Sequence, residues 1–148
     1  MLEQEESRKA SDFGLRASGR EPGVQSLESE PPMTITERIV GDVALIDVTG
    51  RVTFGEGAAL LRDKINSLLH QGHKKLLLNL AGVDYVDSAG LGEIVGTFAT
   101  VRRQGGALKL LGLTSRIRDL LSITKLLTVF ETFDTEGEAI RSFSSVGV

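Results

Sequence analysis

The chain has 148 residues, of which 41% are hydrophobic and 25% are charged, and the absence of cysteine excludes a disulfide framework and a thiol nucleophile. Its formal net charge of −3 comes from residues 1–32, which hold seven acidic and four basic side chains, because the 13 acidic and 13 basic side chains that follow cancel. A neutral domain with one tyrosine and no tryptophan has no basic stripe or stacking platform, which argues against direct binding of nucleic acid.

Residues 1–32 differ in composition from the remainder of the chain. All three prolines, Pro22, Pro31 and Pro32, lie there, with few large apolar residues and no sustained periodicity. This composition predicts a disordered leader over 1–32, followed by one domain over 33–148, and Met33 is a candidate translation start. The N-terminus is charged and no apolar run approaches the length of a membrane span, so we expect a cytoplasmic protein without membrane insertion.

The domain alternates between strand patterns and helix patterns. Gly41 and Asp42 are suited to a two-residue hairpin turn, Gly72 to a helix C-terminus, and Thr135 with Glu138 to a capping box. In chain order we predict strands over 34–40 and 43–49, a helix over 57–71, a strand over 75–80, a loop over 81–86, a helix beginning near 88, a strand over 108–111, a short helix around 117–121, a strand over 128–130 and a final helix opened at 135–138. This order predicts an α/β fold, with a mixed four- to five-stranded sheet covered by helices.

The most informative segment is Asp87-Ser88-Ala89-Gly90-Leu91-Gly92, between an apolar strand and a helix. Asp87 and Ser88 are both residue types that cap helix N-termini, and apolar residues at helical spacing follow them. Unpaired backbone N–H groups and the helix dipole favour negative charge at such a position. The Ser88 hydroxyl is therefore either a helix cap or a group suited to a charge-based switch.

This segment resembles the phosphorylation motif of the bacterial anti-sigma factor antagonists of the STAS domain family, and the likeness covers residues 34–144. By this resemblance Ser88 is the phosphoacceptor, and Ala89 replaces a second serine or threonine seen in many members. Gly50-Arg51-Val52-Thr53 is similar to the family's Gly-x-Leu-Asp segment, with Thr53 where an aspartate is common. Glu138-Ala139-Ile140 resembles the family's closing helix.

The resemblance implies a regulator with a STAS-like fold. Its unmodified form would bind an anti-sigma factor that is also a serine kinase, which frees a sigma factor; phosphorylation of Ser88 would end the contact and a phosphatase would reset it. The implied partner-binding residues are Thr53, Asp87, Ser88, Ala89, Gly90 and Leu91. The alternative is a STAS subunit of a signalling scaffold or of a transporter-associated complex, in which Ser88 is only a cap.

Enzyme and metal-binding patterns are incomplete. A nucleophile elbow needs a glycine two residues before the serine, where Val86 stands. His70 and His73, the only histidines, fall at the end of a helix and in its exit loop, and we expect both at the surface. Asp84 and Asp87 are predicted to be turn and cap residues rather than metal ligands. We therefore predict no enzymatic activity and no metal.

Glycines after Ser88 do not have the spacing of a dinucleotide fingerprint, because Gly92 and Gly96 fall inside the predicted helix rather than in the turn before it. We predict no cofactor. We expect Gly92, Gly96 and Ala99 to form a stripe of small residues that lets a neighbouring element approach the helix closely.

Overall fold

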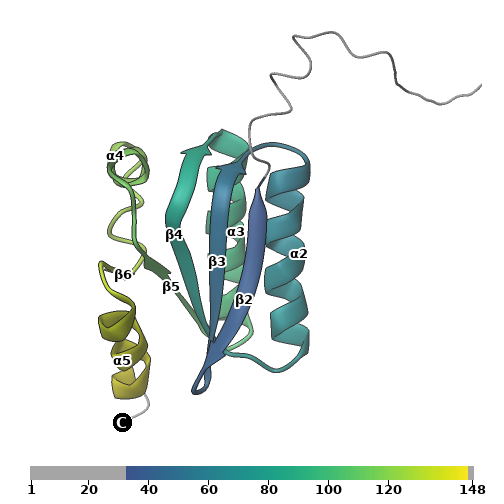
Figure 1. Ribbon diagram of the computed structural model, residues 1–148, viewed down its shortest axis with the longest axis vertical. Coiled ribbons are helices and arrows are strands. Elements are labelled where there is room, and N and C mark those ends of the chain that lie inside the picture. The colour runs from purple at the N-terminus through teal and green to yellow at the C-terminus, as the bar shows by residue number, and fades with distance from the viewer. Residues whose placement is uncertain (1–32, 147–148) are drawn as a thin grey trace, which may run out of the picture. The chain divides into compact units, whose positions relative to one another are not determined.

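The computed structural model describes residues 33–146, so the leader predicted over 1–32 lies outside the described residues. The elements (Figure 1) are β2 (Thr34–Val40), β3 (Val43–Val52), α2 (Glu56–His70), β4 (Lys75–Val86), α3 (Ser88–Arg103), β5 (Ala107–Leu111), α4 (Ser115–Ile123), β6 (Thr132–Phe133) and α5 (Glu136–Val146). The strands form one sheet in the order β2-β3-β4-β5-β6, in which β2 and β3 are antiparallel and the other neighbours are parallel. The predicted α/β class and mixed sheet are confirmed.

Helices cover both faces of the sheet. Helices α2 and α3 lie on one side and α5 on the other (Figure 1). The larger core lies under α2 and α3, where Ile46, Leu78 and Ile65 are fully buried, and a smaller cluster under α5 centres on Leu77 and Phe143. Burying each such side chain contributes about 1.5–3 kcal/mol. Because both faces of β4 are covered, its first half is a nearly continuous apolar run.

Strand β4 is longer than predicted. It continues to Val86, so the prediction of a loop over 81–86 is wrong, and β3 also extends past its predicted end to Val52. The two strands stay paired through register shifts after Asp47 and Gly50, where β4 contains extra residues. Such bulges interrupt the alternation of apolar and polar residues, which explains why the pattern did not indicate a strand here.

The strand predicted over 128–130 is also misplaced. These residues form a turn and a bend, and the short strand β6 lies at Thr132–Phe133 instead. Phe130 packs edge-to-face on Phe98 of α3, with the ring centroids 4.8 Å apart, and is buried. The Phe130 side chain therefore joins the core from a turn rather than from a strand.

The predicted helices and the hairpin are present with shifted ends. The helix predicted over 57–71 is α2, and the hairpin turn contains Gly41 with a positive φ of 63°. At the start of α5 the Thr135 hydroxyl accepts a hydrogen bond from the Glu138 N–H at 3.3 Å, as the capping pattern predicts.

The small-residue stripe predicted on α3 is wrong. Gly92 and Gly96 are exposed, and a Cβ placed on either would have no other atom within 4 Å. The closely packed glycine is Gly90, where a Cβ would lie 2.0 Å from the carbonyl oxygen of Val52. Because each residue advances about 100° around a helix, burial of Leu91 turns Gly92 towards solvent.

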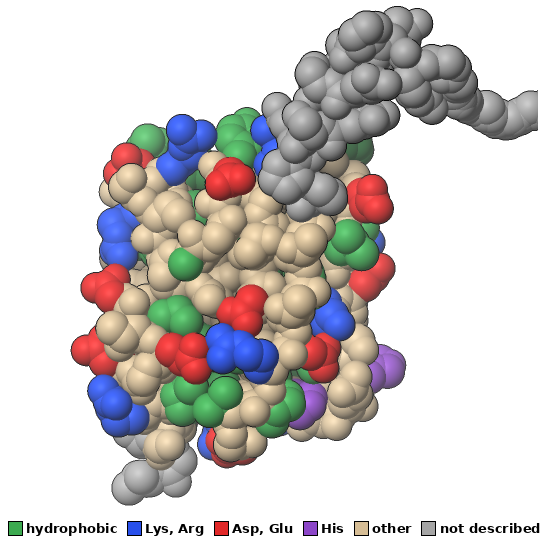
Figure 2. Space-filling view, in the orientation of Figure 1, with side chains coloured by type: hydrophobic (Ala, Val, Ile, Leu, Met, Phe, Trp, Pro, Cys, Tyr) green, Lys and Arg blue, Asp and Glu red, His purple; other side chains and the backbone are tan. Residues whose placement is uncertain are grey.

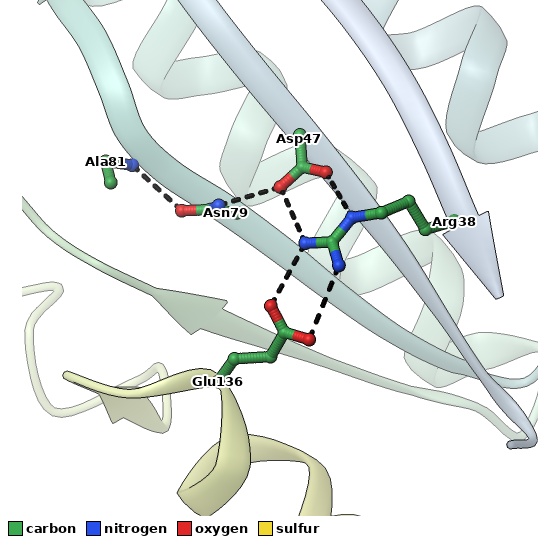
Figure 3. A network of polar contacts seen from close by, with 5 residues as sticks. All are labelled: Arg38, Asp47, Asn79, Ala81 and Glu136. Atoms are coloured by element: carbon green, nitrogen blue, oxygen red, sulfur yellow. Dashed lines mark hydrogen bonds and ion pairs between the residues drawn. The ribbon is translucent and has the colours of Figure 1, made fainter. Parts of the chain in front are cut away.

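A polar network joins α5 to the face of the sheet on which it packs (Figure 3). Arg38 of β2 donates to Asp47 of β3 at 2.8 Å and to Glu136, the first residue of α5, at 3.0 Å. Asn79 of β4 donates to Asp47 at 2.7 Å. The hydrogen bond from Arg38, assisted by that from Asn79, holds the pKa of the Asp47 carboxyl below its usual range. The network thus connects three strands with the start of α5.

Candidate functional site

The ends of β3 and β4 and the start of α3 meet at one edge of the sheet. The Asp87 N–H donates to the Val52 carbonyl at 3.3 Å. The Asp87 carboxylate accepts from the backbone N–H of Phe54 at 3.0 Å and from that of Gly90 at 2.8 Å. One carboxylate therefore holds the β3–α2 turn to the first turn of α3.

Asp87 is the N-cap of α3, with extended backbone angles of φ −93° and ψ −177°. The N–H groups of Phe54 and then Gly90 lower the pKa of its carboxyl, so it is ionised at neutral pH. A negative charge at this helix end is also favoured by the helix dipole. The capping role that the sequence left open between Asp87 and Ser88 belongs to Asp87.

Ser88 is the first residue of α3 and its side chain is exposed. Within residues 33–144 its hydroxyl has no hydrogen-bond partner. The sequence prediction that Ser88 lies at the helix start is confirmed, and its hydroxyl is directed to the surface beside a capped helix end.

The other predicted partner-binding residues lie at different depths. Thr53 is half-buried where β3 ends, and its carbonyl accepts from the Ala58 N–H at 3.0 Å. Ala89 is half-buried, whereas Gly90 is buried and Leu91 is in the core with 9% exposure. The structure therefore brings Thr53 to the same edge as Asp87 and Ser88. The Leu91 side chain faces inward, contrary to what a direct partner contact requires.

Exposed apolar side chains beside Ser88 were missed from the sequence. Phe54, whose backbone is bound by Asp87, is 83% exposed, and Ile123 at the end of α4 is 78% exposed. A shallow groove of about 510 Å³ runs between the end of β4 and α4; its lining residues are Tyr85, Val86, Asp87, Ser88, Arg116, Asp119, Leu120 and Ile123. An exposed apolar side chain on the wall of a groove, as Ile123 is here, is typical of surfaces that bind other proteins. The only sequence signal was a phenylalanine in a turn, outside the helical pattern.

The remaining candidates lie apart from Ser88 or are engaged otherwise. His70 ends α2, about 21 Å along the helix from its first residue, and is exposed as predicted, while His73 is half-buried. Asp84 is exposed, and within residues 33–146 no three His, Asp or Glu side chains gather as a metal site. No helix in that range is long and apolar enough to cross a membrane. Figure 2 shows positive and negative side chains interspersed over the visible face.

Known proteins resemble this chain in both sequence and fold. Residues 32–139 match the STAS domain. The anti-sigma-B factor antagonist of Bacillus subtilis (strain 168) is 45% identical over 74 residues, or 50% of this chain and 67% of that protein. The crystal structure of a Thermotoga maritima protein provisionally named an anti-sigma factor antagonist has a TM-score of 0.66 at 27% identity, over 73% of this chain and 92% of that one. The Bacillus protein SpoIIAA in its phosphorylated form has a TM-score of 0.61 at 21% identity, over 74% and 99% of the two chains, which is a likeness of fold.

Proposed function

The chain belongs to the STAS domain family and is similar to its anti-sigma factor antagonists, and from this premise we propose that its unmodified form binds an anti-sigma factor serine kinase and frees a sigma factor. Phosphorylation of Ser88 then ends the binding, and a phosphatase restores it. The observation that carries this proposal is that two adjacent residues have separate roles. Asp87 caps α3, which leaves the Ser88 hydroxyl exposed and without a hydrogen-bond partner within residues 33–144.

The surface around Ser88 supports binding of the unmodified form. Phe54 and Ile123 are both more than three-quarters exposed, so a partner that covers them removes apolar area from water. Ser88 itself is neutral, and the Asp87 carboxylate beside it already has backbone partners. A partner can therefore cover Ser88 and Asp87 without burying an unpaired charge at these two residues.

Phosphorylation changes this surface more than it changes the fold. A phosphate adds about −1.5 to −2 charge at a helix N-terminus, where the dipole favours negative charge. The Asp87 carboxylate already accepts from the Gly90 N–H, so this donor is not open to the phosphate. Burying this added charge in a partner interface beside that carboxylate costs on the order of several kcal/mol, enough to weaken binding about a thousandfold or more.

The test is to incubate the protein with ATP and each candidate anti-sigma factor kinase from its own genome, and to locate phosphate by mass spectrometry. Ser115 is a matched internal control, because it is likewise the exposed first residue of a helix whose cap, Thr114, precedes it. We expect phosphate on Ser88 and none on Ser115.

Calorimetry with the same kinase tests the switch. Ser88→Ala should bind like the unmodified protein and resist release by ATP, whereas Ser88→Glu should bind weakly. Ser115→Glu adds the same charge to the start of α4 and should bind like the wild type. Equal affinities for Ser88→Ala and Ser88→Glu, or phosphate at another residue, would favour the alternative of a STAS scaffold or transporter-associated subunit.

A further inference from the structure

Arg116 lines the same groove as Ser88, although the two residues belong to different helices. Arg116 is the second residue of α4 and is exposed. The side of α4 that borders the groove carries Arg116, Asp119, Leu120 and Ile123, which have the spacing of one helix face. Ser88 and Arg116 therefore open into one shared space.

The charge of Arg116 is not neutralised by another side chain within residues 33–144. Within residues 33–144 it has neither an ion-pair partner nor a hydrogen-bond partner. By contrast, Arg118 on the same helix lies 3.7 Å from Asp134. A cation in the first turn of a helix also meets the positive end of the helix dipole, so its position disfavours the helix rather than stabilising it.

We infer that Arg116 binds the phosphate of phosphorylated Ser88 and holds it in the groove. This inference rests on the proposed function for the phosphorylation itself. A guanidinium matches phosphate with a planar fork of N–H donors, and such pairs are a common way in which phosphorylation orders a surface. A phosphate drawn towards Arg116 lies across the groove and restricts access to Leu120 and Ile123. Phosphorylation then removes an apolar contact in addition to adding charge.

Two carboxylates also line the groove, and their charges oppose the attraction between Arg116 and the phosphate. Asp87 is held by backbone N–H groups, whereas Asp119 is exposed and repels a phosphate. Arg116 is the one cation among the residues that line the groove. Arg116 should therefore lower the second pKa of the phosphate, and Asp119 should raise it.

The experiment is a ³¹P NMR titration of the full chain with phosphoserine placed at position 88 by an expanded genetic code. A phosphoserine without charged neighbours has its second pKa near about 6. We expect a midpoint about half a pH unit lower in the wild type than in Arg116→Gln, a size typical of a screened surface pair. Asp119→Asn should lower the midpoint further. Arg118→Gln removes the same charge outside the groove and should leave the midpoint unchanged.

Equal midpoints in Arg116→Gln and Arg118→Gln would overturn the inference, whether both shift or neither does. Heteronuclear NMR spectra of each variant confirm that the fold is retained. Because the phosphate is introduced without a kinase, this result is separate from the test of the proposed function. An unshifted midpoint with a working Ser88 switch refutes only the role of Arg116, whereas a shifted midpoint without kinase binding refutes only the proposed function.

Discussion

Replacing Gly90 with alanine tests how α3 is seated on β3, and Gly92→Ala is a matched control two residues along the same helix. A Cβ at Gly90 would lie 2.0 Å from the carbonyl oxygen of Val52 and 2.8 Å from its carbonyl carbon, whereas a Cβ at Gly92 would have nothing within 4 Å. The obstacle at Gly90 is backbone rather than a flexible side chain. Either the first turn of α3 or the end of β3 must therefore move.

The expected changes in the free energy of unfolding have opposite signs. Overpacking a well-packed site costs about 1–3 kcal/mol, and a backbone clash belongs at the upper end of this range. Alanine in a helix recovers about 0.5–1 kcal/mol relative to glycine. We therefore expect Gly90→Ala to lose about 2 kcal/mol and Gly92→Ala to gain about 0.5–1 kcal/mol.

Urea unfolding followed by circular dichroism measures both variants, and an unchanged slope shows that the unfolding reaction is the same. Because the first turn of α3 carries Ser88, Gly90→Ala should also weaken partner binding, and Gly92→Ala should not. A Gly90→Ala protein as stable as the wild type would refute the close approach of α3 to Val52. A destabilised Gly92→Ala protein would instead support the predicted stripe of small residues packed against a neighbouring element.

Two further predictions concern the α5 side of the sheet. Arg38 lowers the pKa of Asp47, so the stability that Asp47 contributes is complete above its unfolded pKa of about 3.9 and is lost as the pH falls through the lower folded value. In urea unfolding as a function of pH, Asp47→Asn should flatten this acid-side decline by no more than about 1 kcal/mol, since the pair is partly exposed; an unchanged profile would contradict the assignment. Lys109, whose side chain is 4% exposed, has its ammonium 2.9 Å from the Ser142 hydroxyl and 3.0 Å from the Glu131 carboxylate. Lys109→Met should cost less than about 1 kcal/mol and Lys109→Ala about 2 kcal/mol or more, because the apolar stem fills space; equal losses would assign the stability to the ammonium instead.

Features that depend on nearby residues were predictable from the sequence. The start of α3 follows from cap residues placed directly before an apolar helical pattern, and the Thr135 cap follows from the same chemistry. The loop predicted over 81–86 failed because pairing to β3, not its own pattern, keeps that segment extended. The strand predicted over 128–130 failed for a similar reason, since Phe130 packs on Phe98, which is remote in the sequence.

The groove beside Ser88 could not be found by local reasoning. Its two walls are the end of β4 and a face of α4, so Arg116 meets Ser88 only through tertiary packing. The Phe54 N–H likewise has its acceptor in Asp87, which lies 33 residues away in the sequence. Sequence reasoning located the phosphoacceptor candidate, whereas the surface that would respond to its charge required the fold.

The order of Asp87 and Ser88 explains how one edge can serve both folding and the proposed regulation. The carboxylate accepts from two backbone N–H groups, so the charge that stabilises the helix start is constant. The hydroxyl is one residue further around the helix and faces outward, so a charge added there leaves those hydrogen bonds in place. If Ser88 itself were the cap, phosphorylation would alter the helix start and the fold together. Assigning the cap to Asp87 separates the energetics of folding from those of partner binding.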